Sequence, residues 1–250
     1  MADARTSRAR PRGRPTATLA LGLGLMLSIA GLVVVARADG TVDRERRRQA
    51  VGADAMMGPD SGPLLAEYYE AFLLDRDLGL FRERVGARYA EETLGRVLDV
   101  SPRVSARRGA VLALGVMGTF DGGNAPLGRA LRDDDAVVRT MAERALWVVW
   151  FRADTPENNR ELEEVRALIA AEALDEAVDR AGRLIARSPK FAEAYNQRAI
   201  AYFKQRRFAE SAEDCIRTLT LNPVHVGALG GLAQCQLELD QPRDALRTLR

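Results

Sequence analysis

Two stretches of this 250-residue sequence follow one pattern: SPKFAEAYNQRAIAYF at residues 188–203 and NPVHVGALGGLAQCQL at residues 222–237. In each, a small polar residue precedes a proline, and the two prolines, Pro189 and Pro223, lie 34 residues apart. Apolar residues then recur at helical spacing. A fixed period of this length indicates a repeated pair of amphipathic helices. The same interval of 34 separates small residues along the chain: Ala199 from Ala233, Ala177 from Ser211, and Ser211 from Ala245.

The small residues and the prolines suggest how one such unit packs and ends. The alanine and serine positions would let the two helices of a hairpin approach closely. Asn222-Pro223 would end the hairpin, because the residue before proline disfavours the helix and proline cannot donate a backbone hydrogen bond into it. On these residues the chain resembles a tetratricopeptide repeat protein over about residues 158–250, in three units. The resemblance implies stacked antiparallel hairpins, the last of which stops at Arg250 inside its second helix and is incomplete.

A looser repeat precedes these units: residues 94–115 and 127–148 align at a shift of 33. Each part predicts a short helix, a turn and a longer helix with an arginine near its start. The stretch LRDDDAVVRTMAERAL, within the second part, resembles a HEAT-type helical hairpin. That resemblance implies a ladder of turn carboxylates and arginines between neighbouring hairpins. The ladder positions are Asp133 or Asp134 with Arg139 in the second unit, and Ser101, which is not acidic, with Arg107 in the first.

Aromatic residues cluster between the two arrays, where Trp147, Trp150 and Phe151 lie close together at helical spacing. We expect them to form a core that joins the arrays; the alternative is a ligand-binding aromatic patch. Thr155-Pro156 then begins the next helix, because threonine caps helix N-termini and proline suits the first turn.

The N-terminus carries a basic tail, residues 1–16, followed by twenty uncharged residues at 17–36. At about 1.5 Å per residue this stretch spans roughly 30 Å, enough to cross the hydrocarbon core of a bilayer. We therefore predict a transmembrane helix or signal anchor, with residues 37–62 as a juxtamembrane linker. Cleavage before Asp39, after the sequence ARA, is the alternative. The basic tail favours its own retention in the cytoplasm, which would place the repeat region outside the cytoplasmic (inner) membrane of a bacterium.

Residues that could carry chemistry are sparse. His225 is the only histidine, which excludes histidine triads and multi-histidine metal sites within the chain. We expect it to pack at a turn. Cys215 and Cys235 could come within disulfide range on neighbouring helices, or could be buried free thiols. No phosphate-binding loop occurs, and the net charge of +2 comes from the basic tail. We therefore predict no enzymatic activity, no cofactor or metal, and no nucleic-acid binding.

Tetratricopeptide arrays bind partner segments in a groove lined by the first helix of each hairpin, and the resemblance implies such a groove here. A clamp for a C-terminal carboxylate is not expected, because Leu162 and Gly227 stand where basic residues would be needed. The groove positions matched by spacing are Glu193, Asn196, Ile200, Phe203, Lys204, Gln234, Leu237 and Glu238.

The whole sequence predicts an all-α fold: an α-solenoid of antiparallel helix hairpins behind one N-terminal transmembrane helix. HEAT-like repeats would occupy residues 63–155 and tetratricopeptide repeats residues 156–250. The expected function is a membrane-tethered, non-enzymatic scaffold that binds a protein or peptide partner in the groove. Two alternatives remain: a secreted or periplasmic binding protein with a cleaved leader, and a regulatory or adaptor subunit of an enzyme carried on another chain.

Overall fold

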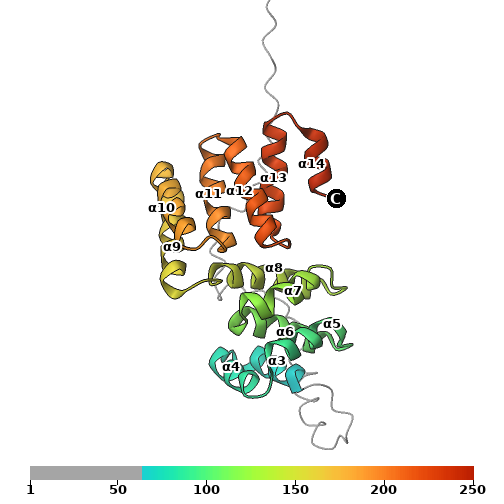
Figure 1. Cartoon of the computed structure of the whole chain (residues 1–250). Coiled ribbons are helices and arrows are strands. Elements are labelled where there is room, and N and C mark those ends of the chain that lie inside the picture. The colour runs from blue at the N-terminus through green and yellow to red at the C-terminus, as the bar shows by residue number, and fades with distance from the viewer. Residues whose placement is uncertain (1–63) are drawn as a thin grey trace, which may run out of the picture.

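The computed structural model describes residues 64–250, which form twelve α-helices and no strand (Figure 1). The predicted all-α class is therefore confirmed for this part of the chain. The predicted basic tail, transmembrane helix and linker lie outside the described residues. Within residues 64–250, no helix is long and apolar enough to cross a bilayer. The helices are α3 (Leu64–Asp75), α4 (Leu78–Gly86), α5 (Glu91–Val100), α6 (Val104–Met117), α7 (Phe120–Ala130), α8 (Ala136–Phe151), α9 (Pro156–Ala170), α10 (Leu174–Arg187), α11 (Ala192–Lys204), α12 (Phe208–Leu221), α13 (Val226–Glu238) and α14 (Pro242–Thr248).

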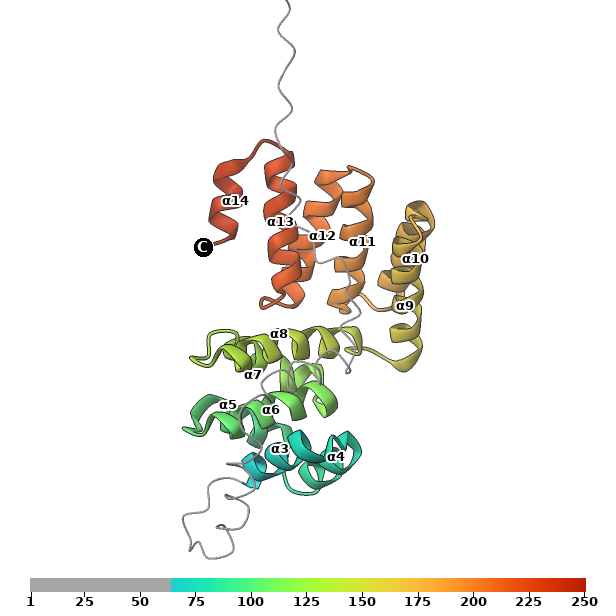
Figure 2. The same cartoon turned by 180° about the vertical axis from the view of Figure 1, so that it is seen from behind.

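Helix α8 lies between two groups of helices. Figures 1 and 2 show α9–α14 standing side by side, with α8 lying across the ends of α11 and α13 and with α3–α7 on its other side. The largest apolar core contains buried side chains from α3 to α8, and Val224 and Val226 pack against it from the far group. The two groups therefore share a core where α8 meets the beginning of α13.

The pairs α9/α10, α11/α12 and α13/α14 repeat with the predicted period of 34. The second residue after the first helix of each pair has a left-handed backbone, with φ of 59°, 62° and 59° at Glu172, Arg206 and Asp240. The following amide then donates to a carbonyl oxygen five residues earlier, which is the Schellman type of helix end. The repeat is thus present in the backbone as well as in the sequence. The three equivalent bonds join Ala173 N to Leu168 O at 2.9 Å, Arg207 N to Tyr202 O at 2.9 Å, and Gln241 N to Gln236 O at 2.7 Å.

Small residues form the contact inside each hairpin. In α11/α12, the Ser211 hydroxyl donates to the Ala199 carbonyl oxygen at 2.8 Å, and both residues are buried. Ala177 and Ala245, which lie 34 residues before and after the serine, are buried as well. A larger side chain at these positions would push the helices apart, so the predicted role of the small residues is confirmed.

Charged side chains connect the hairpins of the N-terminal half. The Arg107 guanidinium in α6 donates two bonds to the Asp133 carboxylate in the next hairpin, at 2.8 and 3.0 Å. Arg107 also donates to the Ser101 carbonyl oxygen six residues earlier, and Arg139 donates in the same way to Asp133 O. Such bidentate pairs add orientation as well as energy. The contact agrees with the expected ladder, while the HEAT-type assignment itself stays a prediction.

The residues that precede two helices cap them with side-chain oxygen atoms. The Asp135 carboxylate caps α8 by accepting from the amide of Val138 at 2.9 Å. The Thr155 hydroxyl caps α9 by accepting from the amide of Asn158 at 3.2 Å, with Pro156 in the first turn. The helix predicted to begin at Thr155-Pro156 is therefore confirmed.

Candidate functional site

The predicted groove positions and their equivalents 34 residues away form pairs of residues on α11 and α13. Near the N-terminal ends of the two helices, these positions are covered by α8. Toward the C-terminal ends, they face solvent. The pairs are Glu193 and Gly227, Asn196 and Gly230, Ile200 and Gln234, Phe203 and Leu237, and Lys204 and Glu238.

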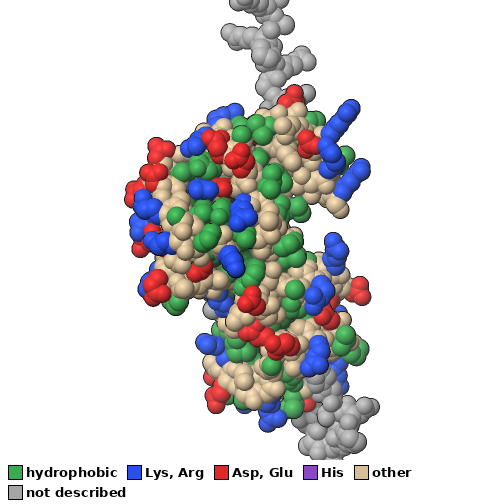
Figure 3. All heavy atoms as spheres, viewed as in Figure 1, with side chains coloured by type: hydrophobic (Ala, Val, Ile, Leu, Met, Phe, Trp, Pro, Cys, Tyr) green, Lys and Arg blue, Asp and Glu red, His purple; other side chains and the backbone are tan. Residues whose placement is uncertain are grey.

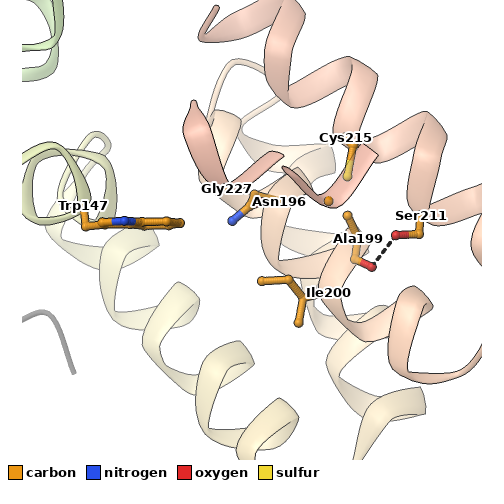
Figure 4. Close-up of a pocket in the computed structure, with 8 residues that line it drawn as sticks. Trp147, Asn196, Ala199, Ile200, Ser211, Cys215 and Gly227 are labelled. Atoms are coloured by element: carbon orange, nitrogen blue, oxygen red, sulfur yellow. Dashed lines mark hydrogen bonds between the residues drawn. The ribbon is translucent and has the colours of Figure 1, made fainter. Parts of the chain in front are cut away.

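Trp147 of α8 fills the covered part. Its indole lies against Gly227 so closely that a Cβ atom on that residue would be 2.6 Å from the Trp147 Cη2 atom. Figure 4 shows the ring extending from α8 toward Asn196 and Gly227. Only a cavity of about 10 Å³ is left between α8, α11, α12 and α13. A partner segment therefore has no room in this half of the groove.

The aromatic residues that follow along α8 hold Trp147 in place. Its ring is stacked on Phe151 at a centroid distance of 5.7 Å and meets Trp150 edge-on at 5.0 Å. The Arg166 guanidinium of α9 lies 4.1 Å from the centroid of the Phe151 ring, within the range of a cation–π contact. These contacts join α8 to both α9 and α13, which confirms the predicted joining core.

A buried hydrogen-bonded cluster lies beside the tryptophans. The Nδ1 atom of His225 accepts from the amide of Ala228 at 3.0 Å and so caps α13. Because a ring nitrogen that accepts a hydrogen bond carries no proton, Nε2 bears it and donates to the Glu193 carboxylate at 2.8 Å. The imidazole also stacks on Trp150 at 4.1 Å. The predicted turn-packing role of His225 is therefore confirmed, and its ring connects two repeats with α8.

Glu193 and Asn196 are inside the protein, contrary to their predicted place on a partner-binding surface. Only 1% of Glu193 and 3% of Asn196 is exposed. The second carboxylate oxygen of Glu193 accepts from the side-chain amides of Asn196 and Gln197 at 2.8 and 2.7 Å. A buried carboxylate needs such partners, because an unpaired charge away from water is strongly destabilising. Both residues therefore support the fold and cannot contact a partner.

Amide side chains continue this contact toward the N-terminal half. The Trp150 indole N–H donates to Asn124 Oδ1 at 2.7 Å, and the Asn124 amide donates to Asn222 Oδ1 at 3.0 Å. These bonds connect α7 and α8 to the turn between α12 and α13. Asn222, expected only to end a hairpin, thus also fixes the position of the C-terminal repeats.

The remaining predicted groove residues lie at or near the surface. Phe203 is half-buried, and its ring packs edge-on against Phe208 at 5.2 Å. The Lys204 ammonium pairs with the Glu172 carboxylate at 2.5 Å. Leu237 is 57% exposed, and a Cβ atom on Gly230 would meet nothing within 4 Å, so this part of α13 is open. We use the name outer groove for the surface where this part of the predicted groove would lie; its residues are Ile200, Phe203, Lys204, Gly230, Gln234, Leu237 and Glu238.

Sequence reasoning missed the covering of the inner groove. The sequence places Trp147 only in a joining core, because no spacing rule indicates which repeat positions a helix from another array will cover. One available signal was the glycine at position 227, where the preceding unit carries Glu193. A residue without a side chain permits close approach by a bulky ring. In residues 64–250 no group of three or more His, Cys, Asp or Glu side chains could hold a metal ion.

Comparison with known proteins found limited similarity. No family model matches the chain. Over 97 residues, 38% of the chain, it is 29% identical to human WD and tetratricopeptide repeats protein 1, and the match covers 14% of that protein. Among solved structures, the yeast Sti1 TPR2AB domain in complex with pHSP90 covers 88% of this chain and 89% of that chain at 22% identity, with a TM-score of 0.37. The sequence match and the hairpins at a period of 34 indicate a tetratricopeptide-like helical repeat protein.

Proposed function

We propose that this protein is a non-enzymatic scaffold that binds a segment of a partner protein in the outer groove, and that the predicted helix at residues 17–36 tethers it to a membrane. The main evidence for the binding role is the exposed side chain of Leu237 on α13. Leu237 is 57% exposed at the position equivalent to Phe203, beside the open surface at Gly230. Covering the exposed part of such a side chain would contribute about 1–1.5 kcal/mol to binding.

The size and charge of the outer groove limit the partner. Because Trp147 closes the inner half, a bound segment would contact only the C-terminal parts of α11 and α13. Lys204 and Glu238 occupy equivalent positions with opposite charges. Figure 3 likewise shows acidic, basic and hydrophobic side chains interspersed over the viewed face. A segment with one or two aliphatic or aromatic anchors between charged residues of both signs fits this surface better than a uniformly charged one.

A photo-crosslinking amino acid at position 237 tests the proposed groove. The full-length chain would be crosslinked in native membranes, and the captured partner identified by mass spectrometry and then purified. The matched control is Ile216 of α12, which is 53% exposed but lies on a second helix of a hairpin. Leu237→Ala should weaken partner binding about 5–10-fold, whereas Ile216→Ala should leave it within about twofold. Equal effects of the two substitutions would contradict the groove.

Phe203 is a less specific probe of the outer groove than Leu237, because its side chain also packs inside its own hairpin. Its contact with Phe208 means that Phe203→Ala removes packing between α11 and α12 as well as groove surface. We therefore expect this substitution to lower both the thermal midpoint and the partner affinity. Leu237→Ala should change the affinity with little effect on the midpoint.

The membrane tether rests on the length and apolarity of residues 17–36. Native protein should remain in the membrane fraction after carbonate washing and should keep its basic N-terminus. A mature chain that begins at Asp39 would show a cleaved leader and contradict the tether.

A further inference from the structure

The two cysteines lie together between α12 and α13. Cys215 is 2% exposed and Cys235 is fully buried, and both are free thiols. Ser211 and Cys215 are one helical turn apart, so they share a face of α12. The Cys235 thiol lies 3.2 Å from the Ser211 hydroxyl oxygen, to which it donates. It is also within hydrogen-bonding reach of the Cys215 thiol.

The two thiols differ in their pKa. The hydrogen bond with Cys235, followed by burial, raises the pKa of the Cys215 thiol well above its ordinary value. The same hydrogen bond lowers the pKa of Cys235 to about 7. Because a thiolate and not a thiol attacks disulfides, this difference favours Cys235 as the attacking sulfur of the pair.

We propose that Cys215 and Cys235 are a modification site, at which a low-molecular-weight disulfide converts the two thiols into an intramolecular disulfide between α12 and α13. The geometry supports the pairing, because the buried Cys235 thiol contacts Ser211 of α12, and Cys215 lies one helical turn from Ser211 on the same face of that helix.

The exchange proceeds in two balanced steps. The Cys235 thiolate attacks one sulfur of the reagent, the sulfur–sulfur bond of the reagent breaks, and one small thiol leaves with the proton from Cys235. Cys215 then gives its proton to solvent, and its thiolate attacks the Cys235 sulfur of the mixed disulfide; the second small thiol leaves as a thiolate and takes up a proton. The protein is oxidised by two electrons, and one reagent disulfide is reduced to two thiols.

Access to the thiols requires opening of the last hairpin. Cys215 lines the cavity beneath Trp147, but at about 10 Å³ this cavity is too small for any disulfide reagent. Within the described residues α14 buries only Ala245 and exposes Leu246 and Leu249, so we expect the α13/α14 hairpin to open more readily than α11/α12. Elements with few buried contacts unfold locally most readily. Oxidation would then link α13 covalently to α12. It would thereby restrict the motion of Gln234 and Leu237, which α13 contributes to the outer groove.

The test uses the full-length chain in mild detergent, incubated with oxidised glutathione and quenched with acid. Intact mass should fall by two hydrogen atoms, and one peptide pair should contain both cysteines. Hydrogen exchange of the α13 amides should become about 100-fold slower after oxidation, because the crosslink closes a loop of about 20 residues. Cys215→Ser and Cys235→Ser are the matched controls; neither can form the bond, and their exchange should not change.

Three results would overturn the proposal. Stable glutathione adducts without loss of two hydrogens would show that the sulfur atoms cannot meet. Unreacted thiols after prolonged incubation near the thermal midpoint would show that they are inert. Unchanged α13 exchange in fully crosslinked protein would show that the bond does not fasten the hairpin.

Discussion

The contact between Trp147 and Gly227 can be tested by adding a single methyl group. In Gly227→Ala the new Cβ atom would lie 2.6 Å from Trp147 Cη2 and 3.0 Å from Cζ2. The indole cannot move aside easily, because it is in contact with Trp150, Phe151 and His225. Overpacking of this kind lowers stability by about 1–3 kcal/mol. We therefore expect α13 to shift away from α8 or the tryptophan cluster to rearrange.

Gly230, one turn further along α13, provides a matched control. A Cβ atom there would meet nothing within 4 Å. Alanine is a better helix former than glycine by about 1 kcal/mol in a helix interior, so Gly230→Ala should raise stability by roughly 0.5–1 kcal/mol. Gly227→Ala gains no more than this and suffers the clash. The two variants should therefore differ by about 1–3 kcal/mol.

Urea and thermal unfolding of both variants, followed by circular dichroism, measure this difference. For a chain of this size about 1 kcal/mol corresponds to roughly 2–4 °C in the midpoint. Replacing Trp147 by phenylalanine removes the clashing atoms, so Gly227→Ala should cost less in that background. A coupling of about 1 kcal/mol or more is expected from the double-mutant cycle. Equal midpoints of the two alanine variants, or strict additivity, would refute the packing of Trp147 against α13.

Three further outcomes follow from the described contacts. Arg206→Gly should raise stability by about 0.5–1 kcal/mol, because the left-handed backbone at φ 62° strains a residue with a Cβ atom; a lowered midpoint would contradict this. Ser211→Trp should lower stability by roughly 1–3 kcal/mol or more by separating the helices at Ala199, and an unchanged melting temperature would argue against the hairpin contact. The hydrogen bonds from Arg108 lower the pKa of Asp135, so its contribution is present above the unfolded pKa of about 4 and is lost as the pH falls through the lower folded value. Arg108→Gln should make the urea midpoint fall less steeply below about pH 4, and a wild-type slope would exclude this pair as a source of acid sensitivity.

The exposure of Leu237 and Gly230 was predictable because it depends on register within a repeat. Leu237 and Gly230 lie where their distance from Pro223 placed them, on the open side of α13. The inner groove was not predictable, because its exposure depends on α8. Glu193 occupies a repeat position that was predicted to face the groove. It is nonetheless buried beside His225, 32 positions away in the sequence. No periodic signal relates these two residues.

The sequence by itself determined the helices, their pairing into hairpins and the period of 34. Those features depend on local interactions: prolines and capping residues mark helix ends, and small residues recur where neighbouring helices touch. Only the tertiary structure decided that α8 crosses the ends of α11 and α13, that Trp147 fills the inner groove, and that Cys215 and Cys235 meet between α12 and α13. Contacts of this second kind join residues whose spacing follows no repeat. They depend on how whole arrays pack against each other, which side-chain volumes and buried polar partners decide together.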